Sequence, residues 1–445
     1  MGITKLSAIA LVSVLGTVGA VVVPVGVAQA GPVGDWDPVV DLSRRAPNIY
    51  EPDVAVDPTG GAAAAWVRSS VDRSGVFVAS RREGRPWRAP VRIPGTRGAA
   101  EVELAVSGDG ERILVWTSGR KVEASRKLPG HRWSDPAVLH RTASGRRGVL
   151  PTSLQLAVNR RGRAVAAWQT LDDDEDAVHA RSRVQASVGR AGGDWTPMRT
   201  LSAPRVSGGD PEAVVGRAGR TTMVWSERAG TRAWVRTVSR EKGEPWGEAR
   251  SLSRRSGEVG RPQVAVRRRG EIAVAWVFQG ETRSGVRLRR WSPATGWGEA
   301  ARVPAIRRGV TWIDLGLDRS RTATVAWANK RGGVWTAKHT PAGTWTREHV
   351  APPGSVFDGI TLVVNRAGDA VLGWGSSVGG DHPVQAAYRR RSSGWGSVNA
   401  LSSVSGDAFR PALALDGAGD AVAVWSHARD ISSPPRVQAR SLDAR

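Results

Sequence analysis

The stretch from Pro52 to Trp66, which reads PDVAVDPTGGAAAAW, decides the fold of this chain, because close copies of it recur along the 445 residues. Near the end it returns as PALALDGAGDAVAVW, from Pro411 to Trp425. Each copy combines a strand of small and branched residues, a turn that contains glycine, a second strand and a closing tryptophan. The closing tryptophans are Trp66, Trp116, Trp168, Trp225, Trp276, Trp327, Trp374 and Trp425, and their spacings are 50, 52, 57, 51, 51, 47 and 51 residues.

The first strand of each copy is apolar on both faces. Val or Leu stands ten residues before the closing tryptophan, as in Val56 and Leu415, and the residue before it is small, as in Ala55. A strand that is apolar on both sides is buried on both sides. Glycine stands six residues before the tryptophan in every copy except the sixth, where Arg321 takes its place. Because glycine adopts positive φ without strain, this spacing predicts a tight hairpin turn.

Each unit has room for four strands. The closing tryptophan is followed by a third strand, such as residues 184–188, and then by a glycine-rich turn, a second tryptophan and a fourth strand. A period near 50 residues built from four strands is typical of a β-propeller blade. The last unit ends without its second tryptophan, whereas Trp36 precedes the first unit. We therefore predict an all-β fold, a single eight-bladed β-propeller over residues 31–445, whose ring is closed by an N-terminal strand that completes blade eight with residues 35–43.

The first 30 residues have the pattern of a secretory signal peptide. Lys5 is their only charge, an apolar run extends from Leu6 to Val27, and Ala28-Gln29-Ala30 has the small-x-small form of a cleavage site before Gly31. The apolar run is also long enough to remain as a membrane anchor, which is the alternative. We therefore expect a protein that is secreted or associated with the cell surface.

The chain is strongly basic and has no cysteine. Its formal net charge is +23, from 64 Lys and Arg against 41 Asp and Glu. Such a charge favours an anionic partner, for example an envelope polymer, although an arginine-rich codon bias would explain it equally. The missing cysteine excludes thiolate catalysis and cysteine metal sites. Arginines gather at the expected first hairpin turns of blades three to six, and we predict that an anionic partner binds Arg161, Arg217, Arg220, Arg267, Arg268 and Arg269.

The pattern Pro-x-Val-Ala-Val-Asp-x-x-Gly-x-Ala-x-x-x-Trp resembles that of secreted repeat proteins of actinobacteria, which are β-propellers, and loosely that of sialidases. The resemblance implies the fold along nearly the whole mature chain. Sialidases use a tyrosine nucleophile beside a glutamate, and this sequence offers only Tyr50, which Glu51 follows, and Tyr388. The sialidase Asp-box Ser-x-Asp-x-Gly-x-x-Trp does not match, because Trp66 follows Gly60 by six residues. The resemblance therefore concerns fold rather than activity.

Carboxylates mark the start of the predicted inner strands. They are Asp53, Glu103, Glu212 and Asp314, with Gln155 and Gln263 at the same position of other copies. Inner strands surround the propeller axis, so these side chains are expected around the central channel. Paired carboxylates there could perform acid–base catalysis, as in a glycoside hydrolase or lyase. Alternatively, the ring only solvates the channel.

Aromatic residues are expected on the face that carries the loops after the second and fourth strands, where propellers commonly bind ligands. The candidates for ligand binding are Tyr50, Phe278, Trp312, Phe357 and Phe409. Exposed rings beside a polar channel would suit sugars or peptides. Packing of each ring into its own loop is the alternative.

Metal sites are not indicated by ligand spacing. The seven histidines show no His-Glu-x-x-His pattern. One acidic run, formed by Asp172, Asp173, Asp174, Glu175 and Asp176, could hold Ca²⁺ through oxygen ligands, but it lacks the alternating spacing and the glycine of a calcium loop. We therefore expect neither a metal nor another cofactor.

The leading hypothesis from the sequence is a non-catalytic scaffold that binds an extracellular or cell-envelope partner, which could be an anionic polymer, a carbohydrate or a protein. Nucleic acid is not the expected partner, and a monomer is the expected state. The alternative is a glycoside hydrolase or lyase that uses the carboxylates around the channel.

Overall fold

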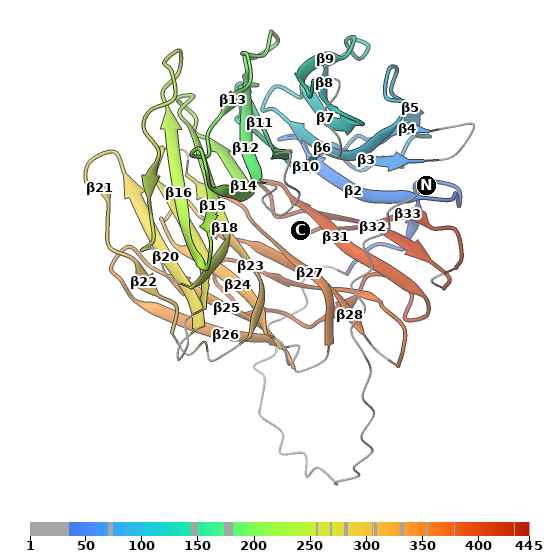
Figure 1. The fold of residues 1–445 in the computed structure, drawn as a ribbon. Coiled ribbons are helices and arrows are strands. Elements are labelled where there is room, and N and C mark those ends of the chain that lie inside the picture. The colour runs from blue at the N-terminus through green and yellow to red at the C-terminus, as the bar shows by residue number, and fades with distance from the viewer. Residues whose placement is uncertain are drawn as a thin grey trace, which may run out of the picture.

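The computed structural model describes residues 35–69, 74–143, 150–172, 181–254, 257–267, 269–279, 284–304, 306, 309–329, 333–352, 355–377, 379–430 and 432–444. The predicted signal peptide, residues 1–30, lies outside the described residues, as do Asp173 to Asp176 of the acidic run and Arg268. Eight antiparallel sheets stand around a common centre (Figure 1). The predicted eight-bladed β-propeller is thus confirmed.

Each blade contributes one strand to the wall of the central channel, and three further strands follow outward. The inner strands are β2 (Ile49–Val56), β6 (Ala99–Val106), β10 (Pro151–Val158), β14 (Ser207–Val215), β18 (Glu258–Val266), β23 (Val310–Leu317), β27 (Ser355–Val364) and β31 (Asp407–Leu415). The second strands are β3 (Ala62–Arg68), β7 (Arg112–Ser118), β11 (Ala164–Asp172), β15 (Thr221–Ala229), β19 (Ile272–Gln279), β24 (Ala323–Asn329), β28 (Ala370–Ser377) and β32 (Ala421–Ala428).

The outer half of each blade is less regular, because its last strand is short in most blades. The third strands are β4 (Gly75–Arg81), β8 (Lys121–Lys127), β12 (Arg181–Gly189), β16 (Arg232–Arg240), β20 (Ser284–Ser292), β25 (Val334–His339), β29 (Val384–Arg389) and β33 (Arg436–Leu442). The outermost strands are β5 (Val91–Arg92), β9 (Ala137–Arg141), β13 (Arg199–Thr200), β17 (Arg250–Ser251), β22 (Ala301–Arg302), β26 (Trp345–Ala351), β30 (Asn399–Ala400) and β1 (Val40–Asp41). A small extra strand, β21 (Gly296–Trp297), also pairs with β20.

The two ends of the chain share blade eight. Strand β1 pairs antiparallel with β33, with Val40 opposite Ala439 and Asp41 opposite Gln438. The amide of Gln438 donates to Asp41 Oδ1 over 2.8 Å. The predicted closure by an N-terminal strand is therefore confirmed, and it gives blade eight the four strands that the other blades have.

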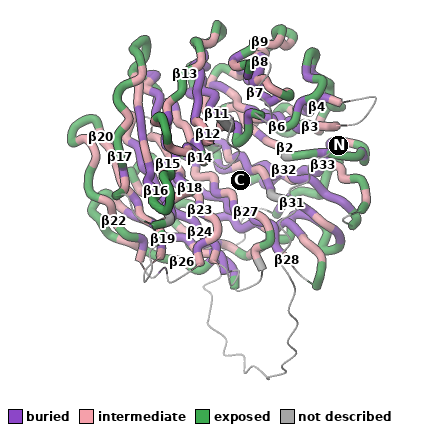
Figure 2. The backbone as a smooth tube through the Cα atoms, viewed as in Figure 1, coloured by how far each residue is buried: buried purple, intermediate pink, exposed green. Residues whose placement is uncertain are grey.

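The closing tryptophans form the core between blades. All eight are buried, with at most 2% of their surface exposed. Several indole nitrogens donate within the blade, as Trp168 does to Gln185 Oε1 over 2.8 Å. Figure 2 shows the buried backbone running along the strands and the exposed residues gathering at the rim. These rings are therefore structural, and they are not available for ligand binding.

Arginine has a structural role in many blades. Guanidinium groups lie over the second tryptophans, for example Arg126 over Trp195 at 5.2 Å and Arg389 over Trp395 at 4.9 Å. In such cation–π contacts the negative face of the ring attracts the guanidinium group. Burial lowers the pKa of Arg389 from its ordinary value. Part of the basic composition therefore stabilises the blades.

Two positions of blade six depart from the repeat. At Gly316, the small residue of the sixth inner strand, an added Cβ would lie 2.1 Å from Val364 Cγ2 of the next blade. Arg321, which replaces the turn glycine in the same blade, adopts a φ of 64°.

Within the described part of the chain, no helix is long and apolar enough to cross a membrane.

Candidate functional site

The inner strands carry one ring of equivalent residues around the channel, which we call the channel ring. Each member stands 13 residues before the closing tryptophan. The backbone register confirms the equivalence, since Asp53 pairs with Ala65 and Glu212 with Val224, each one residue before its tryptophan. In chain order the channel ring is Asp53, Glu103, Gln155, Glu212, Gln263, Asp314, Thr361 and Ala412. All four predicted carboxylates therefore belong to it.

A β-bulge precedes the channel ring in every blade. In blade four the register shifts between Gly209 and Glu212, and in blade three between Thr152 and Gln155. Ser153, Asp210 and Arg261 occupy the same bulge position and have φ values of 53°, 49° and 50°. Left-handed backbone is strained for such residues and is concentrated at functional sites. Bulges also redirect side chains, here at the entrance to the channel.

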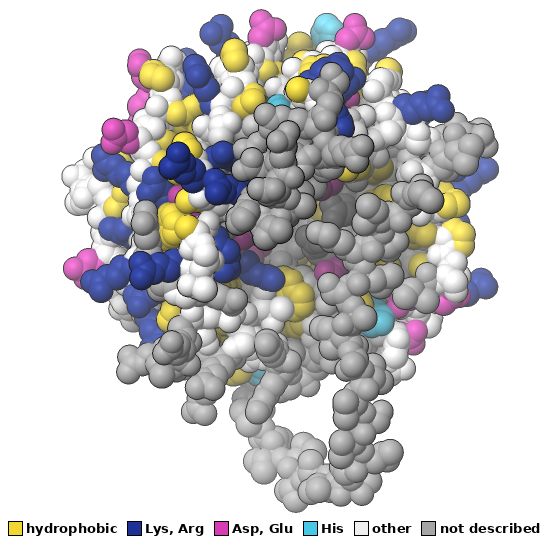
Figure 3. Space-filling model, viewed as in Figure 1, with side chains coloured by type: hydrophobic (Ala, Val, Ile, Leu, Met, Phe, Trp, Pro, Cys, Tyr) yellow, Lys and Arg dark blue, Asp and Glu magenta, His cyan; other side chains and the backbone are white. Residues whose placement is uncertain are grey.

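The bulges of blades two to seven line a cavity of about 980 Å³ at the face where the inner strands begin, which we call the upper cavity. Four members of the channel ring belong to its lining, namely Glu103, Gln155, Glu212 and Gln263. Its described lining includes the carboxylates Glu101, Glu103, Asp210, Glu212, Glu227 and Asp358, and the arginines Arg228 and Arg261. Figure 3 shows a hollow at the centre of one face with acidic side chains beside it. The chain as a whole has a net charge of +23, so the carboxylates of this cavity form a local exception to its positive charge.

Two channel-ring carboxylates connect neighbouring blades. Asp53 accepts the backbone N–H of Val54 over 2.7 Å and that of Leu104 in the next blade over 2.7 Å. Asp314 does the same with Leu315 and, over 2.6 Å, with Leu362 of the next blade. Burial outweighs these donors and raises the pKa of both carboxyls to about 6. Their contacts are those of structural groups.

The pKa of Glu212 is displaced further from its ordinary value than the pKa values of Asp53 and Asp314. Burial is the main cause, and the charge of Asp314 adds to it, so that the pKa of Glu212 rises to about 8. Donation from Gln263 Nε2 to Oε1 over 3.2 Å acts in the opposite direction, and nearby Asp210 raises the pKa further. The Glu212 carboxyl is therefore protonated at neutral pH and lies in the wall of an open cavity.

The other carboxylates of the cavity differ in how they are held. Asp210 Oδ2 accepts from Ser226 Oγ over 3.1 Å and from the Arg261 N–H over 3.3 Å, and the residue is exposed in the cavity lining. Glu227 is 1% exposed and accepts three N–H groups, those of Trp225 Nε1, Trp234 Nε1 and Ala203. Glu227 is thus a structural carboxylate, whereas Asp210 is placed to meet a ligand.

The predicted aromatic residues differ in their surroundings. Trp312 belongs to the lining of the upper cavity. Phe278 packs in the core of its blade with Arg287 at 4.9 Å over its ring. Tyr50, Phe357 and Phe409 are 46%, 47% and 37% exposed and lie outside the cavity lining. Ligand binding by these three stays a prediction.

A second cavity, of about 820 Å³, opens among the first hairpin turns at the opposite mouth of the channel. We call it the lower cavity. Its described lining includes Arg160, Arg217, Arg267, Arg269, Arg319 and Arg366, and a single carboxylate, Asp318. Of the arginines predicted for an anionic partner, Arg217, Arg267 and Arg269 are in this lining.

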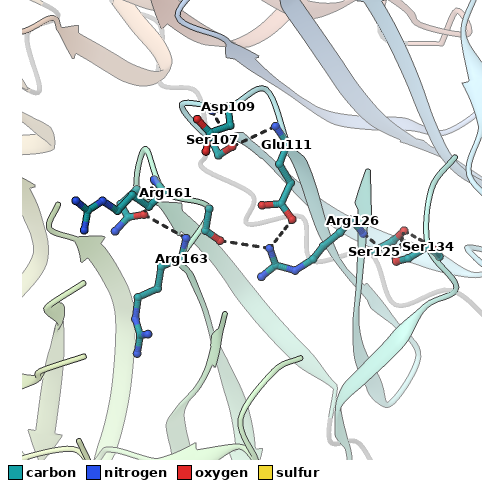
Figure 4. A network of polar contacts seen from close by, with 10 residues as sticks. Ser107, Asp109, Glu111, Ser125, Arg126, Ser134, Arg161 and Arg163 are labelled. Atoms are coloured by element: carbon teal, nitrogen blue, oxygen red, sulfur yellow. Dashed lines mark hydrogen bonds and ion pairs between the residues drawn. The ribbon is translucent and has the colours of Figure 1, made fainter. Parts of the chain in front are cut away.

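The remaining predicted arginines are placed differently. Arg220 pairs with Glu241 and lies 4.1 Å from the ring centre of Trp291. Arg161 is exposed, and Figure 4 shows its side chain pointing away from the Glu111–Arg126 ion pair. Arg268 lies outside the described residues.

The cavity residues that sequence reasoning missed include Glu101, Asp210 and Arg366. Glu101 and Asp210 sit two residues before the channel ring, where a bulge turns them to the channel, and no residue pattern marks the bulge. Arg366 follows Asn365 in the first hairpin turn of blade seven, the equivalent of Arg160 in blade three. The signal in the sequence is an arginine eight residues before the closing tryptophan, in blade seven as in blade three.

Comparisons with known proteins place the chain by fold. No protein-family model and no curated protein matches it. A structure from a study of two prolyl endopeptidases is 13% identical and has a TM-score of 0.50. The match covers 86% of this chain and 55% of the endopeptidase chain. The Hadza microbial sialidase Hz136 is 12% identical, covers 91% of this chain and 95% of its own, and has a TM-score of 0.46. The polysaccharide lyase Uly1 is 10% identical and has a TM-score of 0.47, and the match covers 92% of this chain and 100% of the lyase chain. At such identities the likeness concerns the β-propeller fold alone.

Proposed function

We propose that the upper cavity binds a neutral or cationic carbohydrate and that Glu212 donates a proton to the glycosidic oxygen when the bond is hydrolysed. The observation that carries the proposal is a carboxyl group that is protonated at neutral pH in the wall of an open cavity, beside the carboxylate of Asp210. Hydrolysis of a glycoside needs this pairing of an acid with a carboxylate.

The residues divide the reaction between them. Glu212 protonates the leaving oxygen as the bond between that oxygen and the anomeric carbon breaks, and it becomes a carboxylate. Asp210 stabilises the positive charge that develops on the sugar and accepts a proton from the incoming water. The water oxygen forms the new bond at the anomeric carbon. Asp314 contributes indirectly, because its charge keeps the pKa of Glu212 high.

The lining suits a ligand rich in hydroxyl groups. Gln155 and Gln263 offer both donors and acceptors, and Trp312 offers an aromatic surface. A cavity of about 980 Å³ is at the upper end of the range for small-molecule sites. The negative charge of the cavity opposes uronic acids, so hydrolysis of neutral glycans is favoured over elimination from acidic ones.

The test is release of reducing ends from a panel of neutral and acidic oligosaccharides. We expect turnover of a neutral substrate, and Glu212→Gln should lower kcat by about 10²–10⁴-fold because the variant has no proton to donate. The control is Glu299→Gln at an exposed position. Equal turnover by wild type and Glu212→Gln would contradict the proposal, as would binding without any turnover across the panel.

A second candidate function is the one that the sequence favours, a non-catalytic scaffold that attaches to an anionic polymer outside the cell. The exposed arginines of the lower turns support it, because uncompensated positive charge attracts polyanions. Export, the identity of the polymer and the monomeric state are parts of this proposal.

A further inference from the structure

We infer that the lower cavity is a binding site for a compact ligand that carries several phosphate groups. The inference rests on the second candidate function, attachment to an anion, and adds a defined place and a defined chemistry to it. It concerns the mouth of the channel opposite to Glu212 and is independent of the hydrolytic proposal.

Hydrogen bonds between neighbouring turns hold the lower cavity in shape. The Gly108 N–H donates to Arg160 O over 2.9 Å, and the Arg319 N–H donates to Arg366 O over 3.0 Å. Asn159 Nδ2 donates to Gly216 O over 2.9 Å, which ties blade three to blade four. The backbone of the lining arginines is thus fixed before a ligand arrives, and this preorganisation lowers the entropic cost of binding.

The positive charge of the lower cavity is largely uncompensated. Arg267 pairs with Glu271 over 2.7 Å, and Asp318 Oδ1 accepts the N–H groups of Ser320 and Thr322. Four exposed arginines of the lining make no ion pair with the part of the chain that the structure describes, namely Arg160, Arg217, Arg269 and Arg319. Each of them comes from the first hairpin turn of a different blade, from blade three to blade six. Like charges held around one cavity repel, and an anion between them relieves the repulsion.

The residue type and the shape indicate the ligand. Arginine presents a planar fork of donors that matches phosphate oxygens two at a time. A concave space of about 820 Å³ admits a short chain of phosphates, whereas a flat bilayer cannot enter it. Asp314 precedes the blade-six turn on the same inner strand, so an anion that enters from the lower mouth meets its carboxylate further along the axis. An anion is therefore held at the lower mouth and is not drawn further into the channel.

The test is calorimetric titration of the full chain with tripolyphosphate, which fits the cavity, and separately with poly(glycerol phosphate), which extends beyond it. We expect both to bind, with an affinity that falls as salt rises. The double variant Arg217→Gln/Arg319→Gln should bind tripolyphosphate about 10²-fold more weakly, about tenfold for each lost charge-assisted contact. The matched control is Arg44→Gln/Arg250→Gln, which removes two exposed arginines outside the lining.

The outcomes distinguish failure of the lower cavity as the binding site from failure of the attachment function itself. Equal loss of affinity in both double variants, or binding of the long polymer without binding of tripolyphosphate, would overturn the lower cavity as the site and leave attachment by the general positive charge. If the wild type binds neither probe at low salt, the attachment function fails together with the site. Unfolding curves that superimpose for the three proteins exclude a loss of fold as the cause.

Discussion

Asp53 accepts the backbone N–H of Leu104 over 2.7 Å, and this hydrogen bond joins the inner strand of blade one to that of blade two. The carboxylate also accepts the N–H of Val54, so both of its oxygens are engaged. The same arrangement recurs between Asp314 and Leu362, in blades six and seven. Side chains of the channel ring therefore connect the blades at the place where the ring faces the channel.

Asp53→Asn should change how stability depends on pH. The pKa of Asp53 is about 6 in the folded chain and near 3.8 in the unfolded chain, so the folded state holds the proton more tightly. Its contribution to the free energy of unfolding is greatest below pH 4 and is lost as the pH rises to 6. The free energy of unfolding of the variant, relative to that of the wild type, should rise by about 1–2 kcal/mol as the pH increases across this window. Urea unfolding at several pH values checks this, and parallel curves would refute it.

Asp314→Asn should lower the pKa of Glu212. The charge of Asp314 is the second cause of the raised value, after burial, and asparagine carries no charge. We expect the midpoint of the Glu212 titration to move from about 8 toward more acidic pH in the variant, while burial still holds it above 4.5. A titration of both proteins followed by carboxyl ¹³C shifts measures the difference. An unchanged midpoint would show that Asp314 does not act on Glu212.

Substitution of two arginines of Figure 4 should affect stability to very different extents. Arg126 pairs with Glu111 over 2.8 Å, and both side chains are at most 10% exposed. Arg126→Gln leaves a buried carboxylate without its partner, so it should cost about 3–5 kcal/mol of stability. Arg161→Gln removes an exposed charge and should change stability by about 0.5 kcal/mol or less. Chemical denaturation compares them, and similar values for both would be inconsistent with the structure.

Gly316→Ala should destabilise the contact between blades six and seven. The added methyl group would overlap Val364, and the inner strands cannot separate without disturbing the channel ring. Overpacking of this kind costs about 1–3 kcal/mol. Gly417→Ala is the control, because its added Cβ meets nothing within 4 Å. A thermal unfolding midpoint for Gly316→Ala as high as that of the control would argue against the close approach of the blades.

The fold could be predicted from the sequence because its determinants repeat. Eight copies of one strand–turn–strand–Trp pattern fix the blade, and the position of Trp36 before the first copy reveals the closure of the ring. The channel ring was also within reach, since Asp53, Glu103, Glu212 and Asp314 share one distance from their tryptophans.

The remainder of the site depends on backbone geometry that the residues do not reveal. Ser153, Asp210 and Arg261 adopt left-handed backbone although none is glycine, so neither composition nor spacing identifies the bulge that turns them to the channel. The role of each arginine depends on its neighbours in space. Arg220 and Arg217 lie in the same turn, yet Arg220 stacks on Trp291 whereas Arg217 lines the lower cavity.

Direct measurement of the Glu212 titration tests the central claim, that the upper cavity holds a carboxylic acid that is protonated at neutral pH. Carboxyl ¹³C shifts recorded for the wild type from pH 4 to pH 10, with Glu212→Gln to assign the signal, would give the midpoint. We predict a midpoint at about 8. A midpoint near the ordinary glutamate value of 4.5 would contradict it, because Glu212 would then be ionised at neutral pH and could not serve as the proton donor.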